Sequence, residues 1–219
     1  MSRYDLGAPG EEEFEPGSDR RVLRNKLGLT SPHDANYMEA ALLAVAQGRS
    51  YLQIETDTGI TVDLVRDLHR SWLGPLYEFA GEIRTVDLVK NNVRFAPAAY
   101  LEGSVRELDQ VLAAHTPCEG MVLDRLVAAI ARVHAELVLV HPFREGNGRL
   151  SRWVADLMAL QAGYPPLEWG FDWDPVRRRE WYFAALRRGF AMDFSPLEAL
   201  VEKAVETAVR SAEDPYAEP

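Results

Sequence analysis

Residues 141–152 hold most of the side chains in this chain that could do chemistry, and they read His-Pro-Phe-Arg-Glu-Gly-Asn-Gly-Arg-Leu-Ser-Arg. The Gly-Asn-Gly turn at 146–148 precedes a predicted helix, so its backbone N–H groups can converge on phosphate oxygens. Arg149 and Arg152 are three residues apart and share one face of that helix, where two guanidinium groups can bracket phosphates. These features predict a site for a nucleoside triphosphate.

Two further residues of the same stretch could act on a bound triphosphate. The Glu145 carboxylate suits one position on an octahedral Mg²⁺ ion whose other ligands are phosphate oxygens and water. The His141 imidazole has the pKa range of a general base that accepts a proton from an incoming hydroxyl. Each residue alone has an ordinary structural explanation, but their concentration in one short loop favours a site.

The same twelve residues match the signature of the Fic family, H-P-F-x-(D/E)-G-N-G-R-x-x-R, and the chain resembles a protein adenylyltransferase of that family. The resemblance implies an all-α core and an enzyme that transfers AMP from Mg²⁺-bound ATP to a Ser, Thr or Tyr hydroxyl of a target protein. It implies that His141 is the base and that Glu145 holds Mg²⁺. The nucleotide-binding residues that it implies are Gly146, Asn147, Gly148, Arg149 and, against the γ-phosphate, Arg152.

A second segment extends the resemblance. Phe79–Thr85 resembles the family's aromatic-Ala-Gly-x-x-Arg-Thr stretch, and the alternating residues 84–95 predict a β-hairpin that turns at Lys90-Asn91-Asn92. In the family this hairpin is a flap that covers the site and pairs with an extended target segment. A purely structural ribbon is the alternative. The docking residues implied here are Val86, Asp87, Leu88, Val89 and Lys90.

The rest of the pattern is helical. Apolar residues between Leu123 and Leu137 recur every three or four positions, which predicts a core-facing helix that Pro142 ends. The fold class predicted is therefore all-α, mostly helical, with a small β-hairpin flap. The other predicted helices cover about 31–47, 61–72, 98–115, 148–161, 175–190 and 195–209, with caps at Ser31, Asp174 and Ser195.

The predicted domain organisation is simple. Residues 1–20 are acidic and rich in Gly and Pro, and we expect them to be flexible. A single Fic domain is expected over residues 21–210, followed by a flexible tail at 211–219.

Composition excludes several classes of protein. A net charge of −10 argues against a general nucleic-acid binder, and one cysteine excludes an internal disulfide framework. Neither a membrane span nor a signal-peptide pattern is found in the sequence. We expect no nucleic-acid partner, no membrane and a cytoplasmic location, with a secreted effector left open.

One feature of many Fic proteins is missing from the sequence. Those members carry an inhibitory S/T-x-x-x-E-(G/N) element whose glutamate pairs with the second signature arginine. No Ser or Thr in this chain has a Glu four positions on, and Thr30 with Asp34 comes nearest. We therefore expect either a small antitoxin-like protein that supplies a glutamate to Arg152 or an unrestrained enzyme.

Two alternatives keep the fold and change the function. One is a phosphotransferase that uses another nucleotide or transfers another phosphate-linked group. The other is a toxin-like regulatory module that holds a nucleotide without turnover. The intact Gly-Asn-Gly-Arg loop favours nucleotidyl transfer over phosphorylation.

Overall fold

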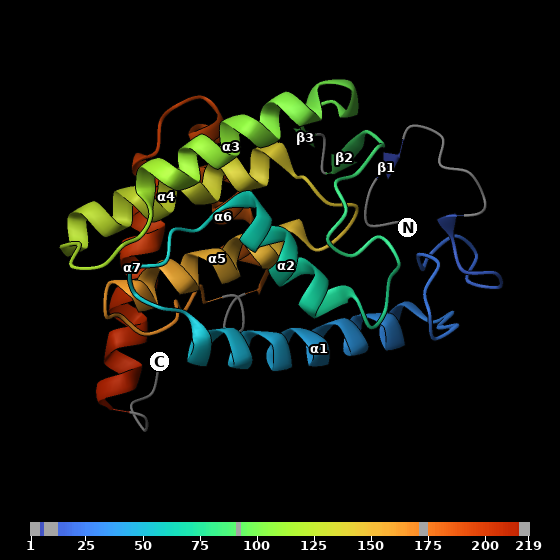
Figure 1. The fold of residues 1–219 in the computed structure, drawn as a ribbon, viewed down its shortest axis with the longest axis horizontal. Helices are drawn as coiled ribbons and strands as arrows, with labels where there is room; N and C mark the ends of the chain where they lie inside the picture. The colour runs from blue at the N-terminus through green and yellow to red at the C-terminus, as the bar shows by residue number, and fades with distance from the viewer. Residues whose placement is uncertain (1–4, 7–12, 91–92, 171–174, 215–219) are drawn as a thin grey trace. The chain divides into compact units, whose positions relative to one another are not determined.

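The computed structural model describes residues 5–6, 13–90, 93–170 and 175–214, and over these ranges the chain is mostly helical (Figure 1). The predicted fold class, mostly helical with a small hairpin, is confirmed. None of the helices in the described ranges is long and apolar enough to span a bilayer. The helices are α1 (Pro32–Gln53), α2 (Val62–Leu73), α3 (Leu101–His115), α4 (Leu123–Val140), α5 (Asn147–Gln161), α6 (Pro175–Phe190), α7 (Ser195–Glu213) and the short 3₁₀ helix η2 (Ala98–Tyr100).

The chain forms two compact units, and the boundaries between them fall between α1 and α2 and inside α3, α4 and α5. The predicted flexible segments, 1–20 and 211–219, lie partly outside the described residues, and the predicted domain limits stay a prediction. Residues 13–20 are described, and Phe14 among them is buried and bridges to Leu23. The first unit is Met1–Gln53, Val62–Glu107 and Val140–Leu150; the second is Ile54–Thr61, Leu108–Leu139 and Ser151–Pro219.

Helix ends follow local sequence signals. The backbone N–H of Asp34 donates to the Ser31 hydroxyl at 3.4 Å, which confirms the predicted cap of α1. Helix α4 ends at Val140, two residues before Pro142, as predicted. The predicted cap of α6 at Asp174 lies outside the described residues.

The capping box predicted at Ser195 is wrong. Phe194 occupies the cap position of α7 and makes no side-chain cap hydrogen bond. The Ser195 hydroxyl donates instead to Asp193 Oδ1 at 2.6 Å, so a neighbouring carboxylate has taken the group that would have capped the helix.

A small antiparallel sheet carries the predicted hairpin. Strands β2 (Leu88–Lys90) and β3 (Val93–Arg94) pair with each other, and the turn predicted at Asn91-Asn92 lies outside the described residues. Strand β1 (Asp5–Leu6) was not predicted and pairs antiparallel with the other edge of β2. The order β1-β2-β3 leaves β2 in the centre.

In the first unit, α1 packs against α2 (Figure 1). Helix α2 buries Val65, Leu68 and Trp72 on one stripe, the pattern of an amphipathic helix against a core. Helix α1 buries few side chains, and one of them is the carboxylate of Glu39. A charge that is buried in this way needs a partner, and the partner lies at the start of α5.

In the second unit, α6 packs against α7. The buried residues of α7 follow the helical period and are all apolar: Leu197, Leu200, Val201, Ala204, Val205 and Ala208. This stripe explains why α7 stays helical without a side-chain cap.

Candidate active site

The loop from His141 to Gly146 joins α4 to α5 and is nearly inaccessible to solvent. His141 is 4% exposed, Phe143 0% and Glu145 5%, so the loop is built as part of the core. His141 has a φ of 50° and Gly146 a φ of 84°, both in the left-handed region. A Cβ atom at Gly146 would come within 2.8 Å of the Trp72 ring, so only glycine fits there.

Asn147 fixes the shape of this loop. Its side-chain oxygen accepts a hydrogen bond from the Phe143 N–H at 2.8 Å, and its side-chain NH₂ donates to the Phe143 carbonyl at 2.7 Å. Both ends of the amide are therefore used within the loop. Asn147 is also the first residue of α5, so one side chain sets the loop and the position of the helix start.

The Glu145 carboxylate lies at the N-terminus of α5. Its Oε1 accepts a hydrogen bond from the Gly146 N–H at 2.8 Å and lies 3.3 Å from the Arg149 guanidinium. The positive N-terminus of a helix attracts anions, and here the Glu145 carboxylate lies at that position of α5. The same end of α5 could therefore attract a phosphate.

Arg149 is held from three sides in the first unit. Its guanidinium lies 2.7 Å from the buried Glu39 carboxylate and 3.3 Å from Glu145, and its Cζ atom lies 4.7 Å from the centre of the Trp72 ring. Its side chain keeps 24% of its exposure. The contacts fix the direction of the guanidinium, and the remaining exposure lets it meet a ligand.

His69 of α2 supports the loop from behind. Its Nε2 lies 3.0 Å from the Glu145 carbonyl, and its Nδ1 accepts a hydrogen bond from the Gly81 N–H at 2.8 Å. A carbonyl only accepts, so Nε2 carries the proton and the ring is neutral. Burial lowers the pKa of His69 to about 4, which keeps it neutral near pH 7. Its ring also stacks on Phe143 at 4.0 Å.

The two ends of the hairpin segment meet at His141. Before the hairpin, Arg84 donates from Nε to the His141 carbonyl at 2.7 Å and from Nη2 to the Val140 carbonyl at 3.2 Å. After the hairpin, the Phe95 ring stacks on the His141 ring, with centres 3.6 Å apart. The residues on either side of the hairpin therefore hold both the backbone and the ring of His141 in place.

Arg152 lies one turn beyond Arg149 on α5 and belongs to the second unit. Its side chain hydrogen-bonds to Tyr182 of α6, as does the side chain of Ser151. Tyr182 in turn contacts His134 of α4 at 2.8 Å. The second arginine of the signature is thus tied to an aromatic cluster.

Comparison with known proteins places the chain among its relatives. A model of the Fic/DOC family matches residues 59–159. The probable protein adenylyltransferase Fic of Salmonella typhimurium is 30% identical over 85% of this chain and 89% of its own length. The chain belongs to the Fic/DOC family. Protein adenylyltransferase VbhT of Bartonella schoenbuchensis is 31% identical over 82% of this chain, which spans only 36% of that protein. The crystal structure of BepC from Bartonella tribocorum with bound AMPPNP shares the fold, with a TM-score of 0.70 and 19% identity over 88% of this chain and 95% of that one.

Within this Fic protein the structure gathers most of the predicted site residues but does not test their roles. His141, Glu145, Gly146, Asn147, Gly148 and Arg149 all lie in the first unit, on one loop and the first turn of α5. Of the predicted docking residues, Leu88, Val89 and Lys90 form β2, while Val86 and Asp87 precede it.

Sequence reasoning missed three residues that hold the Fic loop in place. Glu39, His69 and Arg84 lie far from the loop in sequence and contact it through Arg149, Glu145 and His141. His69 could have been found because it lies among the apolar residues that α2 buries. Arg84 was noted as part of the Phe79–Thr85 stretch, but its contact with His141 was not predicted. Nothing in the sequence distinguished Glu39 from other helix carboxylates.

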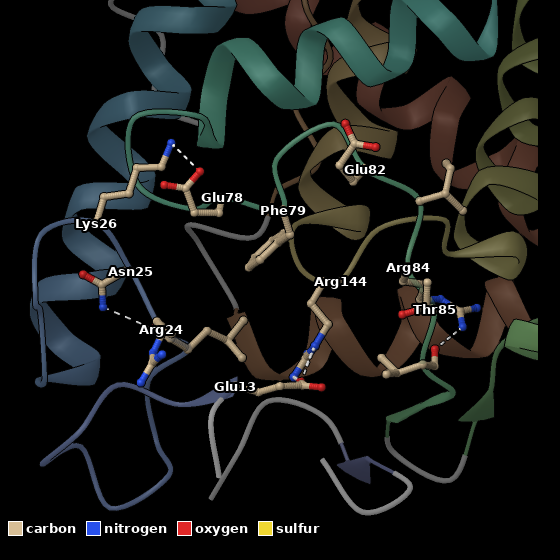
Figure 2. Close-up of a pocket in the computed structure, with 13 residues that line it drawn as sticks. Glu13, Arg24, Asn25, Lys26, Glu78, Phe79, Glu82, Arg84, Thr85 and Arg144 are labelled. Carbon is tan, nitrogen blue, oxygen red and sulfur yellow. Dashed lines mark hydrogen bonds and ion pairs between the residues drawn. The ribbon is translucent and has the colours of Figure 1, made fainter. Parts of the chain in front are cut away.

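A cavity of about 730 Å³ lies in the first unit beside the outer side of the Fic loop (Figure 2). Arg144 of the loop forms an ion pair with Glu13 there at 2.8 Å, and Lys26 lies 3.4 Å from Glu78. Val86 lines this cavity, whereas none of the predicted nucleotide-binding residues is among its described lining residues. The cavity therefore adjoins Arg144 and the start of the hairpin segment, and its described lining does not include the turn predicted to bind phosphate.

The described part of the chain offers few side chains that could hold a metal without help from a ligand. Among the residues that the structure describes, no group of three His, Cys, Asp or Glu side chains could enclose an ion. Glu145 supplies one carboxylate at the start of α5. One carboxylate suits a magnesium ion whose remaining ligands are substrate phosphates and water, so Glu145 fits that mode of binding.

Proposed function

We propose that this Fic protein is a protein adenylyltransferase that transfers AMP from ATP to a Ser, Thr or Tyr hydroxyl of a target protein. Its relatives in Salmonella and Bartonella carry that activity in their names, and the BepC structure holds an ATP analogue. The single observation that carries the proposal is the arrangement of His141. His141, the proposed general base, is the first residue of a loop that ends at the N-terminus of α5, and this loop is buried in the core.

His141 would act as the general base. Its backbone is held by Arg84 and its ring by Phe95, so the imidazole has a restricted direction in which to meet a hydroxyl. The target oxygen attacks the α-phosphorus and gives its proton to the imidazole. The bond from the α-phosphorus to the bridging oxygen breaks, and pyrophosphate leaves. Orientation of this kind lowers the barrier by removing the entropy cost of bringing the reactants together.

The phosphates would be bound by the start of α5. The N-terminus of α5 and the Arg149 guanidinium would face the developing negative charge, and a preorganised positive field of this kind stabilises the transition state. Glu145 would hold Mg²⁺ through its carboxylate. Magnesium held there would supply neutralisation of the phosphate charge.

The target would dock on the flap by adding a strand to the sheet. Residues Val86–Lys90 would supply the backbone edge, and the cavity beside Val86 would lie next to the docked segment. One edge of β2 already pairs with β3 and the other with β1, so a target strand would have to displace β1.

We further propose that the enzyme acts in the cytoplasm and is restrained by a small antitoxin-like partner. The sequence carries no inhibitory S/T-x-x-x-E-(G/N) element. A partner carboxylate that reached Arg152 would compete with the γ-phosphate for the same guanidinium.

The test is a comparison of labels. A lysate is incubated with the protein and either α-³²P-ATP or γ-³²P-ATP, and the modified proteins are then identified by mass spectrometry. The proposal predicts protein-bound label from the α-position alone and a mass shift of AMP on a hydroxyl side chain. Retention of the γ-label would indicate phosphorylation, and no label from either position would contradict transfer altogether.

A further inference from the structure

A buried aromatic cluster in the second unit lies directly behind Arg152. The cluster consists of His134 of α4 (1% exposed), Tyr182 of α6 (4%) and Trp169, which precedes α6 (7%). The His134 ring stacks on Trp169 with centres 4.9 Å apart, and its Nε2 lies 2.8 Å from the Tyr182 hydroxyl. Its Nδ1 lies 3.2 Å from the Ser151 carbonyl, at the residue before Arg152.

The direction of each hydrogen bond in this cluster follows from the chemistry of the groups. A carbonyl oxygen only accepts, so Nδ1 of His134 carries a proton and donates to Ser151. Burial and the charge of Arg152 lower the pKa of His134 to about 3, so the ring is neutral and Nε2 carries no proton. Nε2 therefore accepts, and the Tyr182 hydroxyl donates to it.

This direction decides what Tyr182 offers to Arg152. Its only proton points at His134, so its lone pairs accept the hydrogen bonds that the Arg152 and Ser151 side chains make to it. Burial raises the pKa of Tyr182, so the phenol stays neutral. A neutral acceptor fixes the guanidinium without cancelling its charge, in contrast to the carboxylates Glu39 and Glu145 around Arg149.

We propose that Tyr182, oriented by His134, is a positioning residue that holds the Arg152 guanidinium in place for the terminal phosphate of ATP. The inference rests on the proposed function, because it assumes that this site binds a triphosphate. It adds residues that act through Arg152. Ser151, His134 and Tyr182 would position the arginine, and of these four residues only Arg152 would touch the nucleotide. A merely structural role for Tyr182 would affect folding but would not distinguish one nucleotide from another.

The test compares the affinities of ATP and ADP, which differ by the phosphate in question. Tyr182→Phe removes one oxygen and keeps the ring. We expect it to weaken ATP binding by roughly 3- to 10-fold, the effect of one lost orienting hydrogen bond, and to leave ADP binding within about twofold of the parent. His134→Asn keeps a donor toward Ser151 but removes the acceptor for Tyr182, and it should give the same selective loss. Tyr37→Phe, at a 70% exposed position, is the matched control and should change neither affinity.

A double-mutant cycle with Arg152→Ala shows whether the effect passes through the arginine. In that background Tyr182→Phe should cause no further loss of ATP affinity. Equal loss of ATP and ADP, no loss of either, or a full effect without Arg152 would overturn the inference. If Tyr182→Phe fails to fold, the ATP and ADP affinities of His134→Asn decide by the same criteria. Failure of the parent protein to bind ATP would instead overturn the proposed function, so the two failures are distinguishable.

Discussion

The Glu39 carboxylate lies 2.7 Å from the Arg149 guanidinium, and its other oxygen accepts a hydrogen bond from the Tyr77 hydroxyl at 2.6 Å. Glu39 is 1% exposed, so this is a buried charge whose partners are fixed. Helix α1 therefore holds the first arginine of the signature at the start of α5.

Replacing Glu39 by Gln should destabilise the protein. The change leaves Glu145 as the remaining carboxylate described beside the partly buried Arg149 charge, and the loss should be about 2–3 kcal/mol of unfolding free energy, since Arg149 keeps some exposure. Urea titration measures it. The matched control is Glu102→Gln, which breaks an exposed ion pair with Arg106 and should cost less than about 0.5 kcal/mol. Equal effects of the two substitutions would show that burial of Glu39 does not matter.

Gly146→Ala should have a large effect on stability. The left-handed backbone and the 2.8 Å approach to Trp72 together predict a loss of roughly 2–4 kcal/mol of unfolding free energy. Gly103→Ala is the control, because it lies in α3 with nothing within 4 Å of its Cβ position. It should stabilise the protein by about 0.5–1 kcal/mol. Thermal or urea unfolding of both variants gives the comparison, and a Gly146→Ala protein as stable as the parent would refute the argument.

Acid should destabilise the protein through His69. Its pKa is about 4 in the folded chain and ordinarily 6.5, so below pH 6.5 the unfolded chain takes up a proton that the folded chain refuses. The contribution to stability is complete above pH 6.5 and is lost as the pH falls toward 4. The slope approaches about 1.4 kcal/mol per pH unit for this residue. His134, with a pKa of about 3, acts in the same direction.

The check is urea unfolding at several pH values between 4 and 7. His69→Gln should flatten the pH dependence, whereas His33→Gln, at an exposed side chain, should leave it unchanged. An identical slope in the parent and in His69→Gln would mean that His69 already titrates normally in the folded chain.

Strand β1 should compete with a target for the flap. Asp5 and Leu6 pair with Val89 and Leu88, the residues proposed to receive the target. Deletion of residues 1–7 should raise α-label transfer to lysate proteins by roughly 2- to 10-fold, because the docking edge no longer has to be vacated. The affinity for ATP should stay the same. Unchanged or weaker transfer at equal ATP affinity would mean that the target docks elsewhere.

Sequence reasoning recovered the helices well because their signals are local. Apolar periodicity placed α2 and α4 within a residue or two, the start signal at Asp174 placed α6, and the hairpin followed from alternation. Helix α1 extends to Gln53, beyond the predicted end near 47. Gly48 lies inside it, because one glycine lowers the stability of a helix without ending it. Strand β1 could not be predicted, since two residues carry no periodic pattern and the pairing depends on β2 alone.

The site was predicted only where the motif is continuous. The loop from His141 to Arg149 is one sequence segment, so its residues could be named before the fold was known. The side chains that hold it, Glu39, His69 and Arg84, lie far from it in the chain. Their roles depend on burial and on hydrogen-bond direction, and neither can be seen in a single sequence.

If His141 takes the proton from the target hydroxyl, its removal should abolish transfer while leaving nucleotide binding intact. The parent and His141→Ala proteins are incubated with the same lysate and α-³²P-ATP, after equal melting temperatures and equal ATP affinities have been established. Label transfer should fall by at least about 100-fold in His141→Ala. Transfer at the parent's rate would contradict it.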